Sequence, residues 1–223
     1  MIAERLDGRR IAITGCTGFV GTALVERLLR SVPGCELVLL IRPGSRHDAA
    51  ERARREIFKN NAFDRLRSQL EGGSESFDEM VARRVSVISG DVTSDGLGLN
   101  AEDRALLATC HTVIHSAAAV SFDSPLDSAV EINLLGPVRI AQTLHELGVA
   151  PHLVAVSTCY VAGNRRGSAP EELVSDGPWD IGLSWRREVA SARRLRADTD
   201  RKRGTRAKPP GGTRDEQYQC VHD

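Results

Sequence analysis

The sequence predicts an α/β fold, a doubly wound parallel sheet with helices on both faces. Five short apolar runs alternate with segments of helical periodicity, which is the pattern of a parallel sheet. The runs are continuously apolar instead of alternating, so we expect strands that are buried on both sides. A chain of 223 residues, 41% of them hydrophobic, suffices for one domain with an appended piece.

The expected helices and strands follow from the hydrophobic pattern and from the turn-forming residues between the apolar runs. Strands are expected over residues 10–14, 37–41, 85–89, 112–115 and 153–157. Helices are expected over residues 19–29, 48–71 with a break near Asn60-Asn61, 101–108 and 126–147. We divide the chain into a dinucleotide-binding domain over 1–184, with an insertion over about 46–71, and a basic helix and disordered tail over 185–223.

Composition excludes several classes of partner. The 30 basic and 30 acidic residues balance, so no global field draws in nucleic acid or an anionic membrane. The basic stretch 185–203 could contact nucleic acid or coenzyme A phosphates, but such a run is more often a solvated helix face. Five scattered cysteines predict a reducing compartment and neither a disulfide framework nor a metal site. With no signal peptide and no transmembrane segment expected, the predicted compartment is the cytoplasm.

A glycine-rich turn follows the first expected strand and carries the main functional signal. Gly18 lets a phosphate approach without a Cβ in the way, and Gly21 lets the following helix pack closely on the strand. The free N–H groups of that helix then point at the anion. The turn predicts a Rossmann fold and a pyrophosphate site formed by Gly15, Thr17, Gly18, Phe19, Val20 and Gly21. An ordinary strand-to-helix turn is the alternative.

The residue after the second strand bears on the choice of cofactor. In domains that bind NAD, an acidic residue at this place holds the ribose hydroxyls. This sequence has Arg42, whose planar fork can pair with a 2′-phosphate. The sequence therefore favours NADPH (NADP) over NADH, and a solvated turn arginine is the alternative.

Several segments together resemble one family. TGCTGFVG resembles the T-G-x-T-G-F-x-G of extended short-chain dehydrogenases/reductases. The sequence further resembles fatty acyl-CoA reductases and thioester reductase domains, whose NAD-binding domain is of the male-sterility type, in LIRPGS, GDVTSDGLGLNAEDRALL, VIHSAAAVSFDSPLDSAVEINLLGPVRIAQ and VAVSTCYVAGN. These segments and the Arg/Glu-rich insertion cover most of residues 8–165.

The resemblance implies further cofactor contacts after the third and fourth strands. Asp91 and Val92 lie where the family holds the adenine ring, although a turn or helix-capping aspartate is the alternative. Ser116, Ala117 and Ala118 follow the fourth strand, where small side chains let the backbone line the ribose on the nicotinamide side.

The resemblance also implies a brace and a catalytic residue. Asn133 and Gly136 lie on the long helix, where the family's asparagine braces the active-site strands. Thr158 matches the family's hydroxyl that binds the substrate carbonyl oxygen, and an ordinary β-branched residue at a strand end is the alternative. Tyr160 matches a position beside the active site, and His115 is interpreted as a packed strand-end histidine.

The family's proton donor has no counterpart in this sequence. Carbonyl reduction in the family uses a tyrosine with a lysine four residues later, which lowers the pKa of the tyrosine. Four residues after Tyr160 is Asn164, and four after Tyr218 is His222. The tail fits neither the family nor a folded element. The hypothesis is a truncated or frame-shifted product with an exposed sheet edge, which predicts marginal stability or a need for a partner.

Three functions fit these observations. The first is an NADPH-dependent oxidoreductase of lipid metabolism that reduces a fatty acyl-CoA or carrier-bound thioester to an aldehyde or alcohol, impaired here by the missing pair. The second is a non-catalytic NADP-binding fragment, or a redox-sensing or interaction module. The third is a nucleotide-sugar epimerase or dehydratase of the same superfamily, which the insertion and HSAAAVSFD disfavour. Acyl chain length, end product, activity and oligomeric state stay open.

Overall fold

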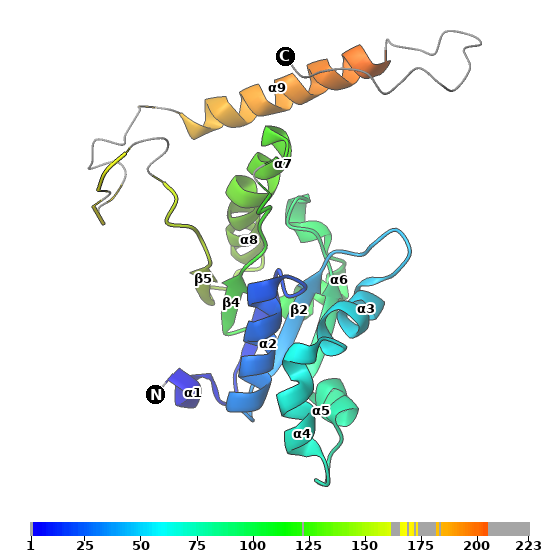
Figure 1. Cartoon of the computed structure of the whole chain (residues 1–223). Helices are drawn as coiled ribbons and strands as arrows, with labels where there is room; N and C mark the ends of the chain where they lie inside the picture. Colours follow the sequence, from blue (N-terminus) through cyan, green and yellow to red (C-terminus); the bar gives the residue numbers. More distant parts are fainter. Residues whose placement is uncertain are drawn as a thin grey trace, which may run out of the picture. The chain divides into compact units, whose positions relative to one another are not determined.

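The computed structural model describes residues 2–121, 123–161, 166–168, 170, 171, 173, 182 and 184–204 (Figure 1). They fall into two compact units, Met1–Asp180 and Ile181–Asp223. The first unit holds the sheet, and the second holds helix α9 (Trp185–Gly204). The tail expected to be disordered lies outside the described residues.

The first unit is built on five parallel strands in the order β3-β2-β1-β4-β5. The strands are β1 (Arg10–Thr14), β2 (Glu36–Ile41), β3 (Val85–Ser89), β4 (Thr112–His115) and β5 (His152–Ala155). The strand order reverses direction between β1 and β4, which is the topological switch point of a doubly wound fold. The predicted fold class is confirmed.

Alternate residues of the central strands face two separate cores, so helices cover both sides of the sheet. On one side Ile11, Ile13 and Leu39 pack with α2 (Phe19–Ser31) and with the segment between β2 and β3. On the other side Ala12 and Val38 pack with α6 (Ala101–Ala108) and α8 (Leu135–Glu146). Figure 1 shows α2 beside β2, with the helices of the β2–β3 segment grouped nearby.

Burial on both sides was predicted for every strand, and this is wrong for the two outer ones. All four residues of β5 are exposed, and β3 has one fully buried residue, Ile88. Both are edge strands of the five-stranded sheet, and no residue of β5 belongs to either buried core. The fifth strand also ends at Ala155, two residues before the predicted end, because its partner β4 stops at His115.

The segment between β2 and β3 is longer and more varied than the predicted helix over 48–71. The predicted break is confirmed, since the Asn60 side chain accepts a hydrogen bond from the N–H of Ala62 and starts a new turn. A capping box between Ser76 and Glu79 starts a helix that was not predicted. The elements here are α3 (Ala49–Arg52), η1 (Ala53–Phe58), η2 (Asn61–Phe63), α4 (Asp64–Leu70) and α5 (Phe77–Arg84).

The helix predicted over 126–147 contains a turn of π-helix. It consists of α7 (Leu126–Ala129), the π segment η4 (Val130–Leu134) and α8. Pro137 supplies a reason, because its ring crowds the carbonyl four residues before it and its nitrogen donates no hydrogen bond. Two short elements were not predicted, α1 (Ile2–Leu6) and η3 (Asp95–Gly98).

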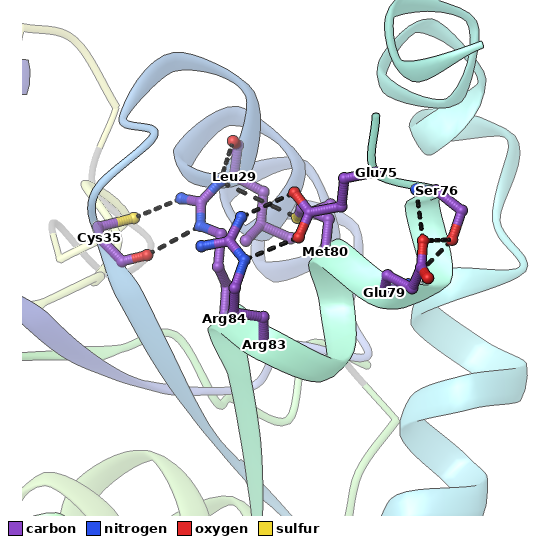
Figure 2. Close-up of polar contacts among 8 residues, drawn as sticks. All are labelled: Leu29, Cys35, Glu75, Ser76, Glu79, Met80, Arg83 and Arg84. Atoms are coloured by element: carbon purple, nitrogen blue, oxygen red, sulfur yellow. Dashed lines mark hydrogen bonds and ion pairs between the residues drawn. The ribbon is translucent and has the colours of Figure 1, made fainter. Parts of the chain in front are cut away.

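A buried arginine ties the β2–β3 segment to the main core (Figure 2). Arg84, at the end of α5, is 5% exposed. Its guanidinium donates to the carbonyls of Leu29 at 2.7 Å, Val32 at 2.6 Å and Cys35 at 3.0 Å. These carbonyls lie at and just beyond the C-terminus of α2, where a cation offsets both the unpaired acceptors and the helix dipole.

Replacing Arg84 tests how much it contributes to the stability of the fold. Arg84→Met removes the side-chain donor from three buried carbonyls, of which that of Val32 keeps a second donor, the N–H of Cys35. We therefore expect the free energy of unfolding to fall by about 2–4 kcal/mol. Urea denaturation followed by circular dichroism measures the change. The control is Arg83→Met, whose exposed guanidinium pairs with Glu75 at 2.7 Å and should contribute about 1 kcal/mol or less. Equal losses in both variants would contradict the assignment.

Candidate cofactor site

A cleft opens at the C-terminal ends of β1, β2, β3 and β4, where a doubly wound sheet binds its ligand. It encloses about 250 Å³. Its lining comes from the last residues of β1 and β2 and from the four loops that follow these strands, together with one residue each from α3 and η4. The lining residues are Thr14, Gly15, Cys16, Thr17, Gly18, Leu40, Ile41, Arg42, Arg52, Gly90, Asp91, Val92, Thr93, Ser116, Ala117, Ala118 and Ile132.

Gly15 brings two of these loops into contact. Its φ is +72°, a conformation that favours glycine. A Cβ at this position would lie 2.4 Å from the carbonyl carbon of Ser116 and 2.5 Å from the nitrogen of Ala117. The backbones after β1 and β4 therefore approach each other at a distance that only glycine allows.

The first turn of α2 presents its N–H groups at the end of this loop. The residue before the helix is Gly18, which has no side chain to cap those N–H groups, so they are left for an anion. Gly21 packs the helix against the loop, since a Cβ there would lie 2.2 Å from the carbonyl oxygen of Gly15. The side chains of Phe19 and Val20 are exposed and lie outside the cleft lining, so any contact from these two predicted residues is through their backbone.

Two arginines stand at the end of β2. Arg42 is 62% exposed at its side chain, and its Nη1 lies 3.8 Å from the Asp91 carboxylate. Arg52, from α3, donates through Nη1 to the carbonyl of Arg42 at 2.5 Å. Its other nitrogens hold the Glu56 carboxylate at 2.7 Å, and this hydrogen bonding lowers the pKa of Glu56. Arg52 thus fixes the backbone from which the Arg42 side chain extends.

Asp91 has one carboxylate oxygen engaged and one turned toward Arg42. Its Oδ1 accepts from the N–H and from the hydroxyl of Thr93, both at 2.8 Å, as in an Asx turn. Its own N–H donates to the carbonyl of Leu97 at 2.8 Å. Leu97 has a φ of +59°, which is rare for a leucine, and its side chain is buried in the core. The loop after β3 is therefore held in one conformation.

The loop after β4 is held by a single amide. Asn133, in η4, accepts from the N–H of Ala119 at 2.8 Å and donates to its carbonyl at 2.9 Å. This pair of hydrogen bonds fixes the chain directly after Ser116, Ala117 and Ala118, which line the cleft. Gly136 lies against the side chains of Val92 and His115.

His115 is a buried neighbour of the cleft. It is 3% exposed, and its Nδ1 lies 2.7 Å from the hydroxyl oxygen of Thr14, which lines the cleft. Burial lowers the pKa of His115, so the ring is neutral near pH 7. The predicted packed histidine at a strand end agrees with this geometry.

The predicted catalytic residue is not part of the cleft lining. Thr158 is exposed three residues after the end of β5, and its hydroxyl oxygen accepts from the N–H of Tyr160 at 3.1 Å. Tyr160 is 83% exposed. Thr158 was predicted to lie at the end of the fifth strand, and this is wrong because β5 ends at Ala155. Its role in binding a carbonyl stays a prediction.

Of the other predicted cofactor residues, the structure brings nine into one cleft: Gly15, Thr17, Gly18, Arg42, Asp91, Val92, Ser116, Ala117 and Ala118. Sequence reasoning missed Arg52 and Thr93. A Thr two residues after an Asp is a signal for an Asx turn and could have indicated Thr93. Arg52 is one of many arginines in its segment, and no local pattern distinguishes it.

The strand order, the glycine cradle and the cleft at the switch point define a Rossmann dinucleotide-binding domain. Residues 13–216 match a protein family described as "Male sterility protein". Because the match spans most of the sequence, the chain belongs to this family, within the extended short-chain dehydrogenases/reductases that include the fatty acyl-CoA reductases. The cofactor of such a domain is a nicotinamide dinucleotide.

Individual relatives agree with this family. The chain is 29% identical to fatty acyl-CoA reductase 8 of Arabidopsis thaliana over 84% of this chain and 39% of that protein. It is 35% identical to fatty acyl-CoA reductase 1 of Mus musculus over 80% of this chain and 33% of that protein. The terminal R domain of the myxalamid PKS-NRPS pathway superposes with a TM-score of 0.51 and 28% identity, over 72% of this chain and 37% of that one.

The chain therefore spans less than half the length of the relatives that it matches.

Within the ranges that the structure describes, no helix is both long enough and apolar enough to cross a membrane.

Acid should destabilise the fold through His115. Since burial lowers its pKa in the folded chain, the unfolded state binds the proton more readily, and stability falls as the pH drops below the ordinary value for histidine. One such group removes up to about 1.4 kcal/mol per pH unit in that window. We expect His115→Gln to show a weaker loss between pH 7.5 and pH 5.5 than the unmodified chain in urea denaturation.

The exposed histidine His152 provides the control, because His152→Gln should leave the pH dependence of unfolding unchanged. A pH dependence that is the same in all three proteins would show that His115 does not titrate as its burial requires.

Proposed function

We propose that the chain binds NADPH in the cleft and is the cofactor-binding part of a reductase that acts on acyl thioesters. The observation that carries the proposal is the pair of arginines at the end of β2, next to a glycine cradle that a Cβ would fill. Membership of a family whose relatives are named fatty acyl-CoA reductases supports the substrate class, acyl-CoA or a carrier-bound acyl group.

The preference for NADPH over NADH rests on charge. A 2′-phosphate carries negative charge that a ribose hydroxyl lacks, and the planar fork of Arg42 can hold it through two hydrogen bonds. The Arg52 guanidinium adds positive charge to the same wall, although Glu56 offsets part of it. The second oxygen of Asp91 faces this wall and is placed to accept from the amino group of an adenine ring.

Catalysis is expected to be impaired in the chain with this sequence. NADPH supplies a hydride when it is bound. Thr158 is proposed to bind the carbonyl oxygen of the thioester, and a positioned acid generally contributes about 10²–10⁴-fold. The sequence holds no tyrosine with a lysine four residues later. A non-catalytic NADP-binding role is the second candidate, and the place of Thr158 outside the cleft lining favours it.

The cytoplasm stays the proposed compartment. The unpaired thiols of Cys16, Cys35, Cys110 and Cys159 are compatible with a reducing environment.

Cofactor preference is tested at Arg42. Arg42→Met removes the guanidinium and keeps a long side chain, so the Kd for NADPH should rise about tenfold or more, while the Kd for NADH should change little. Fluorescence titration with both cofactors measures this. Arg46→Met is the matched control, since Arg46 is an exposed arginine four residues later that does not line the cleft. Equal losses for NADPH and NADH would remove the argument for a 2′-phosphate site.

Turnover separates the two candidate functions. The chain is incubated with NADPH and a long-chain acyl-CoA, and loss of NADPH absorbance is followed over time. Saturable NADPH binding without turnover is the expected result. Turnover would show that another residue replaces the tyrosine, and absence of any NADPH binding would contradict the proposed function.

A further inference from the structure

Arg139 is a buried cation that none of the roles discussed so far explains. It lies on α8 and is 9% exposed. Its Nη2 lies 2.5 Å from the Glu131 carboxylate, and its Nη1 donates to the Glu131 carbonyl at 3.0 Å and to the Val92 carbonyl at 3.5 Å. Its Nε lies 3.6 Å from the Asp95 carboxylate. The guanidinium therefore joins the helix to the middle of the loop after β3, at Val92, and to the start of η3, at Asp95.

Arg139 binds the helix at its π turn. The N–H of Leu135 donates to the carbonyl of Val130, five residues before it. In an α-helix that N–H would donate to Glu131, four residues before it. The Glu131 carbonyl accepts instead from Nη1 of Arg139, which lies eight residues later on α8. This hydrogen bond and the contact with the Glu131 carboxylate tie the π turn to α8.

The same π turn holds the opposite wall of the cleft. Asn133, two residues after Glu131, binds both backbone groups of Ala119 and so fixes the loop after β4. Ile132, between these two residues, lines the cleft itself. One turn of π-helix is therefore linked to both walls, to the loop after β4 through Asn133 and to the loop after β3 through Arg139. π turns are rare and are frequent at functional sites.

We propose that Arg139 is a positioning residue for cofactor binding, which holds the Asp91–Thr93 wall in register with the π turn and so shapes the adenine end of the cleft. This inference rests on the proposed function, because it assigns the adenine end of a dinucleotide to that wall. Arg139 touches no cofactor atom in this account and acts through the Val92 and Glu131 carbonyls.

The test uses the full chain, Arg139→Met, and Arg30→Met as the matched control. Arg30 is also largely buried and also lies 2.5 Å from a glutamate, Glu26, but it lies in the last turn of α2 and does not line the cleft. Calorimetric titration with NADPH and with 2′,5′-ADP, which carries the adenine half alone, gives the affinities. Amide hydrogen exchange of the unliganded chain reports on residues 90–93 without any ligand.

We expect Arg139→Met to weaken both ligands about tenfold and to speed amide exchange at residues 90–93, while Arg30→Met changes neither. Unchanged exchange and affinity in Arg139→Met, or the same changes in both variants, would overturn the proposal. If the unmodified chain binds neither ligand, the proposed function fails, and the exchange rates still decide whether Arg139 holds this loop.

Discussion

Two backbones meet at the ends of β1 and β4, and the rest of the cleft depends on that contact. The glycine at position 15 turns with a positive φ and lies so close to Ser116 and Ala117 that a methyl group would not fit. This contact aligns the loop before α2 with the loop after β4. The N–H groups in the first turn of α2 stay open for a different reason, because Gly18 has no side chain that could cap them.

Around this contact, the walls of the cleft are held by groups from the elements that follow each loop and, for Arg139, from a helix distant in the sequence. Arg52 fixes the end of β2, Leu97 and Arg139 fix the loop after β3, and Asn133 fixes the loop after β4. Most of these hydrogen bonds go to backbone groups of the loops. They fix the position of each wall and leave the side chains that face the cleft available to a ligand. That arrangement suits a site whose ligand is recognised by backbone N–H groups and a few charges.

Local patterns were enough to predict the parts of this site that depend on neighbouring residues. The glycine spacing, the five strands and the arginine after β2 are signals of a few residues each, and parallel strands place their C-terminal ends together. The end of β5 was mispredicted because apolar Val156 continues the hydrophobic pattern beyond the last residue paired with β4. The π turn was missed because periodicity does not distinguish it from an α-helix, although Pro137 is a signal for local distortion.

Contacts made across the fold could not be predicted from the sequence. Arg52 and Arg139 sit among 30 basic residues, and only the folded chain shows which ones reach a backbone carbonyl. Thr158 shows the opposite case, since a motif predicted its role while its hydroxyl bonds locally to Tyr160 outside the cleft lining. A motif gives the residue type at a position, whereas the distance to the reacting atoms depends on the packing of several elements.

Calorimetric titration of NADPH into Gly15→Ala tests the central contact most directly, with Gly148→Ala as the control. Both glycines have a positive φ, +72° and +69°, but a Cβ at Gly148 meets nothing within 4 Å. Both variants bear the cost of a left-handed alanine, and only Gly15→Ala forces the two loops apart. The account predicts that NADPH binding is lost in Gly15→Ala and kept in Gly148→Ala. Binding of equal affinity in the two variants, measured where both are folded, would contradict it.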